Sequence, residues 1–175
     1  HTVLLHHGMV VVGLPYAFSA GAMMLWGRRS DRRGERIWHV ALPALVGAAG
    51  FIASIYAGSS LGALCALGVA SMGLYALLGP FWAIPPTFLA GTAAAGGIAL
   101  INSIGNLGGF AGPYLIGWLK QSTGGFNAGM AALAAGLVGA ALLILYLGRG
   151  LNRAQGSIDG RAPFPAPRPD ESGPR

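Results

Sequence analysis

The chain has 175 residues, of which 54% are apolar and only 9% are charged, and its mean hydropathy is +0.60. A soluble domain carries about 25% charged residues, whereas the stretch 37–119 contains no Asp, Glu, Lys or Arg. Membrane-spanning helices can be built from so long a charge-free stretch, but a water-exposed surface cannot. The composition therefore excludes a soluble enzyme, a disulfide-rich secreted domain, a coiled coil and a disordered chain, and it predicts an integral membrane protein.

Apolar runs long enough to cross a bilayer occur five times along the chain. A span needs about 20 mostly apolar residues, and segments rich in Gly, Pro or Arg separate the runs. We therefore expect an all-α membrane protein with five transmembrane helices over about 9–26, 38–57, 61–82, 92–118 and 127–147. These spans form one bundle over 1–148. The segment 149–175 is rich in Pro, Gly and charge, and we expect a disordered tail there.

The basic residues are segregated along the chain, although a net charge of +6 and a pI of about 10.3 could suggest a nucleic-acid partner. Five Arg lie within 28–36, five more follow Gly148, and Lys120 is the remaining basic residue. With five spans both Arg clusters fall on one side of the membrane, as the positive-inside bias requires, whereas four spans would divide them. We therefore expect a cytoplasmic loop and tail, membrane lipid as the partner of the Arg side chains, and no nucleic acid.

The clearest local motif is the loop Gly27-Arg28-Arg29-Ser30-Asp31-Arg32-Arg33-Gly34-Glu35-Arg36. Its two glycines allow the chain to reverse between two helices, and Asp31 is expected to cap the helix that follows. From the residues alone, the loop could serve membrane topology and nothing more. Three residues beside it are expected to anchor the chain at the membrane interface: Trp26, Trp38 and His39.

The fourth predicted span combines small and polar residues. Its glycines form a stripe at which another helix can approach closely: Gly105, Gly108, Gly109 and Gly112. Asn102 and Asn106 lie one turn apart and share a face of the same helix. These amides could bond a neighbouring helix, or they could face an aqueous path, because polar groups inside a membrane are costly and often mark pathways. The residues alone leave both alternatives open.

Two groups of residues resemble the major facilitator superfamily. The pattern Gly-x3-Asp-Arg-x-Gly-x-Arg resembles the signature loop that follows the second and the eighth helix of that superfamily. The runs 80–85, 91–96 and 102–109 resemble the tenth and eleventh helices of its anion:cation symporter family, in particular the bacterial tartrate- and hydroxy-acid-transporter-like members. The resemblance covers about 8–148 and implies that the chain supplies helices eight to twelve of a twelve-helix fold.

The resemblance implies a secondary transporter that moves a small organic anion, such as tartrate or a related hydroxy or sugar acid, with protons by alternating access. In such transporters the loop latches one transport state, a role that falls here on Gly27, Asp31, Arg32, Gly34 and Arg36. Glu35 departs from the usual basic residue. Similar transporters bring an Asn and a Trp of these helices to the substrate, which predicts a substrate site made by Asn106 and Trp82, with Asn102, Ser103 and Tyr75 close by.

The resemblance also implies a partner, the missing first half of the transporter, and a multi-pass location in the bacterial inner membrane. Since no charged residue lies inside any predicted span, we do not expect the segment alone to transport. The alternative is a non-transporting membrane subunit that packs in a larger complex. Neither a nucleophile–base pair nor paired carboxylates occur within the spans, and His6 and His7 have no third ligand at a suitable spacing. We therefore expect no enzyme, no cofactor and no metal site.

Overall fold

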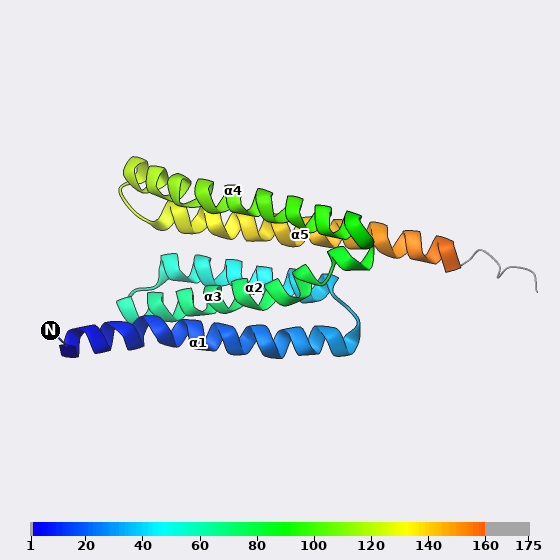
Figure 1. Cartoon of the computed structure of the whole chain (residues 1–175). Coiled ribbons are helices and arrows are strands. Elements are labelled where there is room, and N and C mark those ends of the chain that lie inside the picture. Colours follow the sequence, from blue (N-terminus) through cyan, green and yellow to red (C-terminus); the bar gives the residue numbers. More distant parts are fainter. Residues whose placement is uncertain (1, 160–175) are drawn as a thin grey trace, which may run out of the picture.

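The computed structural model describes residues 2–159, with the side-chain environments of 13 and 15–150. This part of the chain consists of helices and contains no strand. The helices are α1 (Thr2–Arg33), α2 (Ile37–Tyr56), α3 (Ser60–Trp82), the 3-10 helix η1 (Pro85–Thr87), α4 (Gly91–Thr123) and α5 (Asn127–Asp159) (Figure 1). The expected all-α fold with five long helices is confirmed.

Local residues set the ends of the helices. Ser59 caps α3, because its side chain accepts a hydrogen bond from the backbone N–H of Gly62 at 3.1 Å. Gly124 ends α4 with a φ of 75°, and Gly34 has a φ of 63° between α1 and α2. Glycine adopts this left-handed conformation without strain. These short turns make consecutive helices run antiparallel (Figure 1).

The outer helices are longer than the spans that we expected from hydropathy. α1 continues to Arg33, so Asp31 lies within a helix rather than in an irregular loop. α5 continues past 148 to Asp159, and the rest of the expected tail, 160–175, lies outside the described residues. Among the described helices, three segments are long and apolar enough to cross a membrane: Ile37–Tyr56, Ser60–Thr87 and Asn127–Gly150.

Small residues let α2 and α3 pack closely. A Cβ atom added to Gly50 would lie 2.5 Å from the backbone N of Ala70, and one added to Gly73 would lie 2.6 Å from the carbonyl oxygen of Pro43. Only glycine permits such an approach between two helix backbones. α2 also packs against α5. The buried residues of these contacts are mostly alanine: Ala41, Ala44, Ala48, Phe51, Ala70, Ala134 and Ala141.

Hydroxyl and aromatic side chains join α1 to α3. The buried Ser19 donates from Oγ to the carbonyl of Pro15 at 2.7 Å, and the same Oγ lies 2.9 Å from the Oγ of Ser71. Since the proton of Ser19 is used on Pro15, the hydroxyl of Ser71 is the donor between the two. Tyr16 and Tyr75 meet edge to face nearby, with ring centroids 6.1 Å apart. The seam between α1 and α3 is therefore partly polar.

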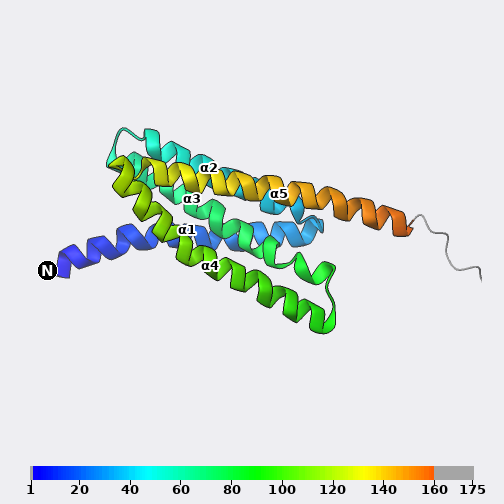
Figure 2. The same cartoon turned by 90° about the horizontal axis from the view of Figure 1, so that it is seen from above.

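α4 is a long helix without a buried residue. It packs against α5 and η1, and it lies on the opposite side of the molecule from α1 (Figure 1). Seen from above, α4 crosses over α3 and α1 at an angle instead of running along them (Figure 2). In the described chain, a Cβ added to any glycine of the predicted stripe would meet nothing within 4 Å. The small-residue face of α4 is therefore open.

Candidate functional site

A hydrogen bond connects α1 to α2 next to a proline of α2. Pro43 has no N–H, so the carbonyl of His39, four residues earlier in α2, has no donor within its helix. The indole Nε1–H of Trp26 on α1 donates to this carbonyl at 2.8 Å, and the two rings lie 5.2 Å apart. His39 is 5% exposed, so the expectation that it anchors the chain at the membrane interface is wrong. Trp38 is 60% exposed, as an anchor would be.

Glu35 connects three parts of the loop. Its Oε1 accepts from the backbone N–H of Trp38 at 2.8 Å, its Oε2 lies 2.9 Å from Nδ1 of His39, and its carbonyl accepts from the hydroxyl of Ser30 at 2.9 Å. Because an ionised carboxylate can only accept, Nδ1 of His39 carries the proton of their contact. The expectation that Asp31 caps α2 is wrong, since Glu35 accepts from the first turn of α2 and Asp31 is exposed within α1.

Arg36 connects the loop to the C-terminal end of α3. Its Nη1 donates to the carbonyl of Ala83, the residue that caps the C-terminus of α3. Carbonyls at this end of a helix lack intrahelical partners and carry the negative end of the helix dipole, so a guanidinium is well matched to them. Arg36 is thus the predicted latch residue whose side chain reaches another helix within the described chain.

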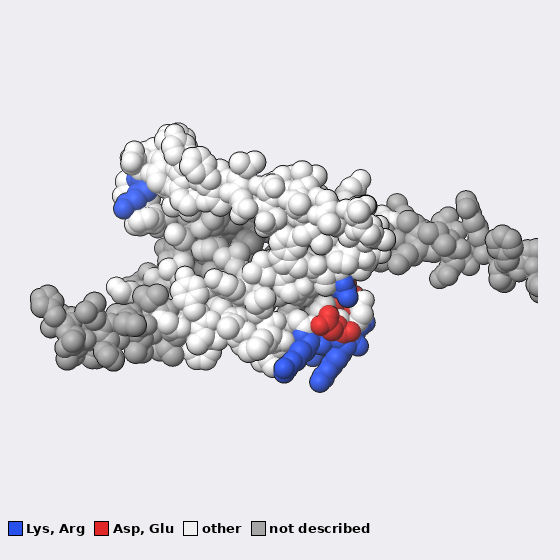
Figure 3. Space-filling model, in the orientation of Figure 1, with Lys and Arg blue, Asp and Glu red and all other residues white. Residues whose placement is uncertain are grey.

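The other predicted latch residues lie around this contact. Gly34 provides the left-handed turn, and Gly27 approaches α3, where a Cβ on Gly79 would lie 3.8 Å from its Cα. Arg32 lines a surface hollow of about 650 Å³ together with Arg28, Arg29 and Arg33. Figure 3 shows charged side chains gathered at this end of the molecule and a small basic patch at the opposite end, where the last turn of α4 carries Lys120. The face between them is uncharged.

Two of the predicted substrate residues lie on α3. Tyr75 and Trp82 are seven residues apart and 36% and 37% exposed. The ring of Tyr75 packs on Tyr16 of α1, and the ring of Trp82 meets the neighbouring Phe81 edge to face at 5.4 Å. Each aromatic ring is therefore held on one side and open on the other.

The other three lie on α4 and are exposed: Asn102, Ser103 and Asn106. Ser103 donates to the carbonyl of Ala99 at 2.9 Å in its own helix. Since α4 packs mainly against α5 and η1, the residues on α3 and those on α4 do not close into one site within the described chain. The expected substrate site stays a prediction, and its two halves face outward from this bundle.

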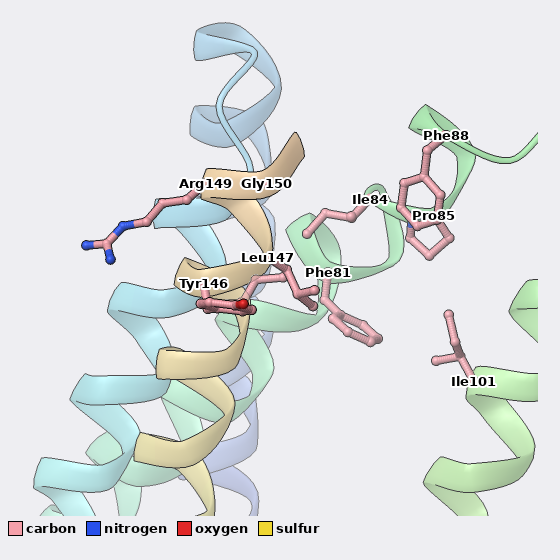
Figure 4. A pocket seen from close by; sticks show the side chains of 10 residues that line it. Phe81, Ile84, Pro85, Phe88, Ile101, Tyr146, Leu147, Arg149 and Gly150 are labelled. Carbon is pink, nitrogen blue, oxygen red and sulfur yellow. The ribbon is translucent and has the colours of Figure 1, made fainter. Parts of the chain in front are cut away.

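An apolar cavity of about 660 Å³ lies between the end of α3, η1, α4 and the end of α5 (Figure 4). Its lining includes Phe81, Ile84, Pro85, Phe88, Ile101, Ile144, Tyr146 and Leu147. Arg149 also lines it, but Figure 4 shows the guanidinium directed away from Ile84 and Phe88. None of the five predicted substrate residues contributes to this cavity, and its surface does not suit a small organic anion.

Four residues that sequence reasoning did not assign to the site organise the loop: Trp26, Ser30, Glu35 and His39. The signal that could have found this network is Pro43, because a proline four residues after His39 leaves the carbonyl of His39 in need of a donor. Among the described residues, no group of three His, Cys, Asp or Glu could hold a metal ion. The side chains of His6 and His7 lie outside the described part.

Sequence comparison relates the chain to bacterial transport proteins. It is 47% identical over 141 residues to a protein of Agrobacterium vitis that is named as a tartrate transporter, a match that covers 81% of this chain and 31% of the relative. It is 40% identical over 117 residues to a quinolone resistance transporter of Acinetobacter baumannii, covering 67% and 27%. It is 36% identical over 143 residues to the inner membrane transport protein RhmT of Escherichia coli, covering 79% and 32%. No family model and no solved structure matches the chain.

These relatives are of the kind that the loop and helix motifs predicted, and their names describe transporters rather than enzymes. The resemblance to bacterial tartrate transporters is therefore confirmed. The chain spans only about 31% of the length of the Agrobacterium vitis relative that it matches. It is an all-α membrane-protein segment related by sequence to bacterial membrane transporters.

Proposed function

We propose that the chain is the C-terminal bundle, helices eight to twelve, of a major facilitator transporter in the bacterial inner membrane. The transporter moves a small organic anion, such as tartrate or a related hydroxy or sugar acid, together with protons by alternating access. The observation that carries this proposal is the 47% identity to a protein named as a tartrate transporter. That relative is about three times as long as the matched segment, which supports a partner domain that completes the transporter.

In this transporter the substrate lies against the exposed faces of α3 and α4, and the partner domain closes the site. Trp82 and Tyr75 supply flat walls with an indole N–H and a phenol, while the amides of Asn102 and Asn106 donate to carboxylate or hydroxyl oxygens. Ser103 lies beside them on α4. Their exposure leaves them accessible to a ligand, as the assignment requires. Since 37–119 is free of charge, the charged groups that bind the anion and carry protons belong to the partner domain.

The second candidate is a non-transporting subunit that packs in a larger membrane complex. The open glycine face of α4 favours it, because small residues at such a face suit contact with another helix. The two candidates assign different roles to the amides on α4. As substrate residues they affect binding, whereas as packing residues they affect only the amount of folded protein.

The test uses the complete protein that contains this segment, reconstituted in vesicles with an imposed proton gradient. We expect uptake of labelled tartrate or another hydroxy acid, and we expect Asn106→Ala to raise the KM about tenfold, the loss typical of one hydrogen bond to a charged group. Gln121→Ala, on the same helix but outside the predicted site, is the control and should transport normally. Substrate should also protect Asn106→Cys from a small thiol reagent in a Cys65→Ala background.

Two results would contradict the transporter proposal or its site. If the complete protein inserts normally and takes up none of the hydroxy or sugar acids offered, the chain is not part of such a transporter. If Asn106→Ala lowers the amount of inserted protein but leaves uptake per molecule and KM unchanged, Asn106 is a packing residue.

A further inference from the structure

We propose that Glu35 and His39 are positioning residues that hold the α1–α2 loop in the conformation in which Arg36 reaches the end of α3. Neither belongs to the five residues that the resemblance assigns to the latch. The consequence for transport rests on the proposed function and on the latch role that the resemblance implies for this loop. The positioning itself is a property of the loop and can be measured separately.

Glu35 is held on both its backbone and its side chain. The buried hydroxyl of Ser30 fixes its carbonyl at 2.9 Å, and its two carboxylate oxygens are bound by the N–H of Trp38 and by Nδ1 of His39. With these three contacts in place, the peptide that leads from Glu35 into Arg36 has one orientation. Arg36 is the N-cap of α2, with a φ of −113°, and its side chain starts from this fixed point.

A basic residue at position 35 could not accept these two hydrogen bonds. Lys and Arg side chains are donors without an acceptor, so neither could accept from the N–H of Trp38 nor from Nδ1–H of His39. Five Arg already lie in the same loop, and another positive charge would add repulsion. Glu35 replaces the basic residue that the superfamily pattern has at this position, and its contacts in this structure require an acceptor.

His39 joins this network to α1. Its carbonyl accepts from Trp26 because Pro43 provides no N–H, and its ring lies against the indole while Nδ1 donates to Glu35. The ring is therefore fixed between a tryptophan of α1 and the carboxylate of the loop. A neutral ring with the proton on Nδ1 and a protonated ring both make this donation.

The end point of the network adjoins the predicted substrate site. Arg36 binds the carbonyl of Ala83, which directly follows Trp82 in the chain, and the two bonded residues are 47 positions apart in sequence. Release of the loop would therefore free the end of α3 that carries Trp82. The positioning of Arg36 by Glu35 and His39 is thus a physical connection between the cytoplasmic loop and one wall of the proposed substrate site.

Spin labels on the complete protein test the positioning. In a Cys65→Ala background, labels at Arg33→Cys in the loop and Thr87→Cys in η1 report the distance from the loop to the end of α3. We expect one narrow distribution in the parent and a broad one in Arg36→Ala, Glu35→Ala and His39→Leu. The released population should rise about tenfold, the factor for one charge-assisted hydrogen bond. Glu35→Gln and His39→Asn should keep the narrow distribution: the amide oxygen of Gln accepts from Trp38 while its NH2 donates to Nδ1 of the other histidine tautomer, and the amide of Asn donates to Glu35. Arg29→Ala is the control.

The outcomes separate positioning from the proposed function. A narrow distribution in both Glu35→Ala and His39→Leu overturns the positioning role, and if one of them does not insert, the other gives the answer. Equal broadening in Arg29→Ala also overturns it, since the effect would then follow from any loss of charge or fold. If the distribution broadens as expected while uptake by the same variants is unchanged, the positioning role stands and the latch role that the resemblance implies for the loop fails.

Discussion

The α2–α3 contact allows a quantitative prediction for Gly73→Ala. The added Cβ would lie 2.6 Å from the carbonyl oxygen of Pro43 and 2.6 Å from the backbone N of Gly47. These are backbone atoms, which cannot rotate away as the end of a side chain can. The added Cβ would also lie 2.7 Å from the Cα of Gly47, and since carbon atoms reach favourable contact at about 3.5 Å, the two helices must separate by roughly 1 Å along this seam.

This separation sets the expected loss of stability. Overpacking a close-packed interior costs about 1–3 kcal/mol, and here the strain falls on helix backbones and loosens the contacts of the buried Ala70 and Ala76. We therefore expect Gly73→Ala to lower the free energy of unfolding by about 3 kcal/mol, the upper end of that range. The matched control is Gly68→Ala on the same helix, where a Cβ would meet nothing within 4 Å. Alanine is favoured over glycine in helices, so this control should change stability by less than about 1 kcal/mol, towards greater stability.

Reversible unfolding in mixed detergent micelles, followed by tryptophan fluorescence, measures both variants against the parent. The four tryptophans of the chain make an added probe unnecessary. Equal stability of Gly73→Ala and Gly68→Ala would refute the reasoning, because it would mean that the α2–α3 seam is not close-packed around Gly73.

Two further predictions concern the loop and the topology. Trp26→Phe keeps an aromatic ring but removes the donor to the carbonyl of His39. We therefore expect a loss of about 1–3 kcal/mol in the free energy of unfolding, measured in the same micelles. An unchanged free energy of unfolding would show that another donor replaces the indole. In a Cys65→Ala background, a membrane-impermeant thiol reagent added outside intact cells should modify Ser122→Cys and leave Arg33→Cys unmodified, and external modification of position 33 would reject the proposed orientation.

Local properties made the helices predictable. The length of each apolar run and the position of the Arg residues are visible in the chain itself, and they gave five long helices, as the structure has them. The error at Asp31 has a local cause as well. The last turn of α1 carries Arg32 and Arg33, which stabilise the C-terminal end of a helix, so α1 runs through Asp31, and Glu35 instead accepts from the first-turn N–H of Trp38.

Long-range contacts were not predictable in the same way. Pro43 reveals that the carbonyl of His39 needs a donor, but the rotation of α1 against α2 decides that Trp26 supplies it. Likewise, the spacing of Tyr75 and Trp82 defines a face of α3, but it does not reveal that Tyr75 packs on Tyr16 of α1 or that α3 and α4 do not meet at these residues within the described chain. The substrate site therefore stays a prediction, since its two halves are exposed and do not meet within the described residues.

Pro43 in α2 decides the order in which two substitutions can be tolerated. As long as Pro43 is present, losing Trp26 leaves the carbonyl of His39 without a donor, at a cost of about 1–3 kcal/mol. If Pro43 is first replaced by a residue with an N–H, the helix satisfies this carbonyl itself, and position 26 is released from selection for an indole. The two positions are therefore epistatic, and descendants of this sequence can lose the pair cheaply in one order only.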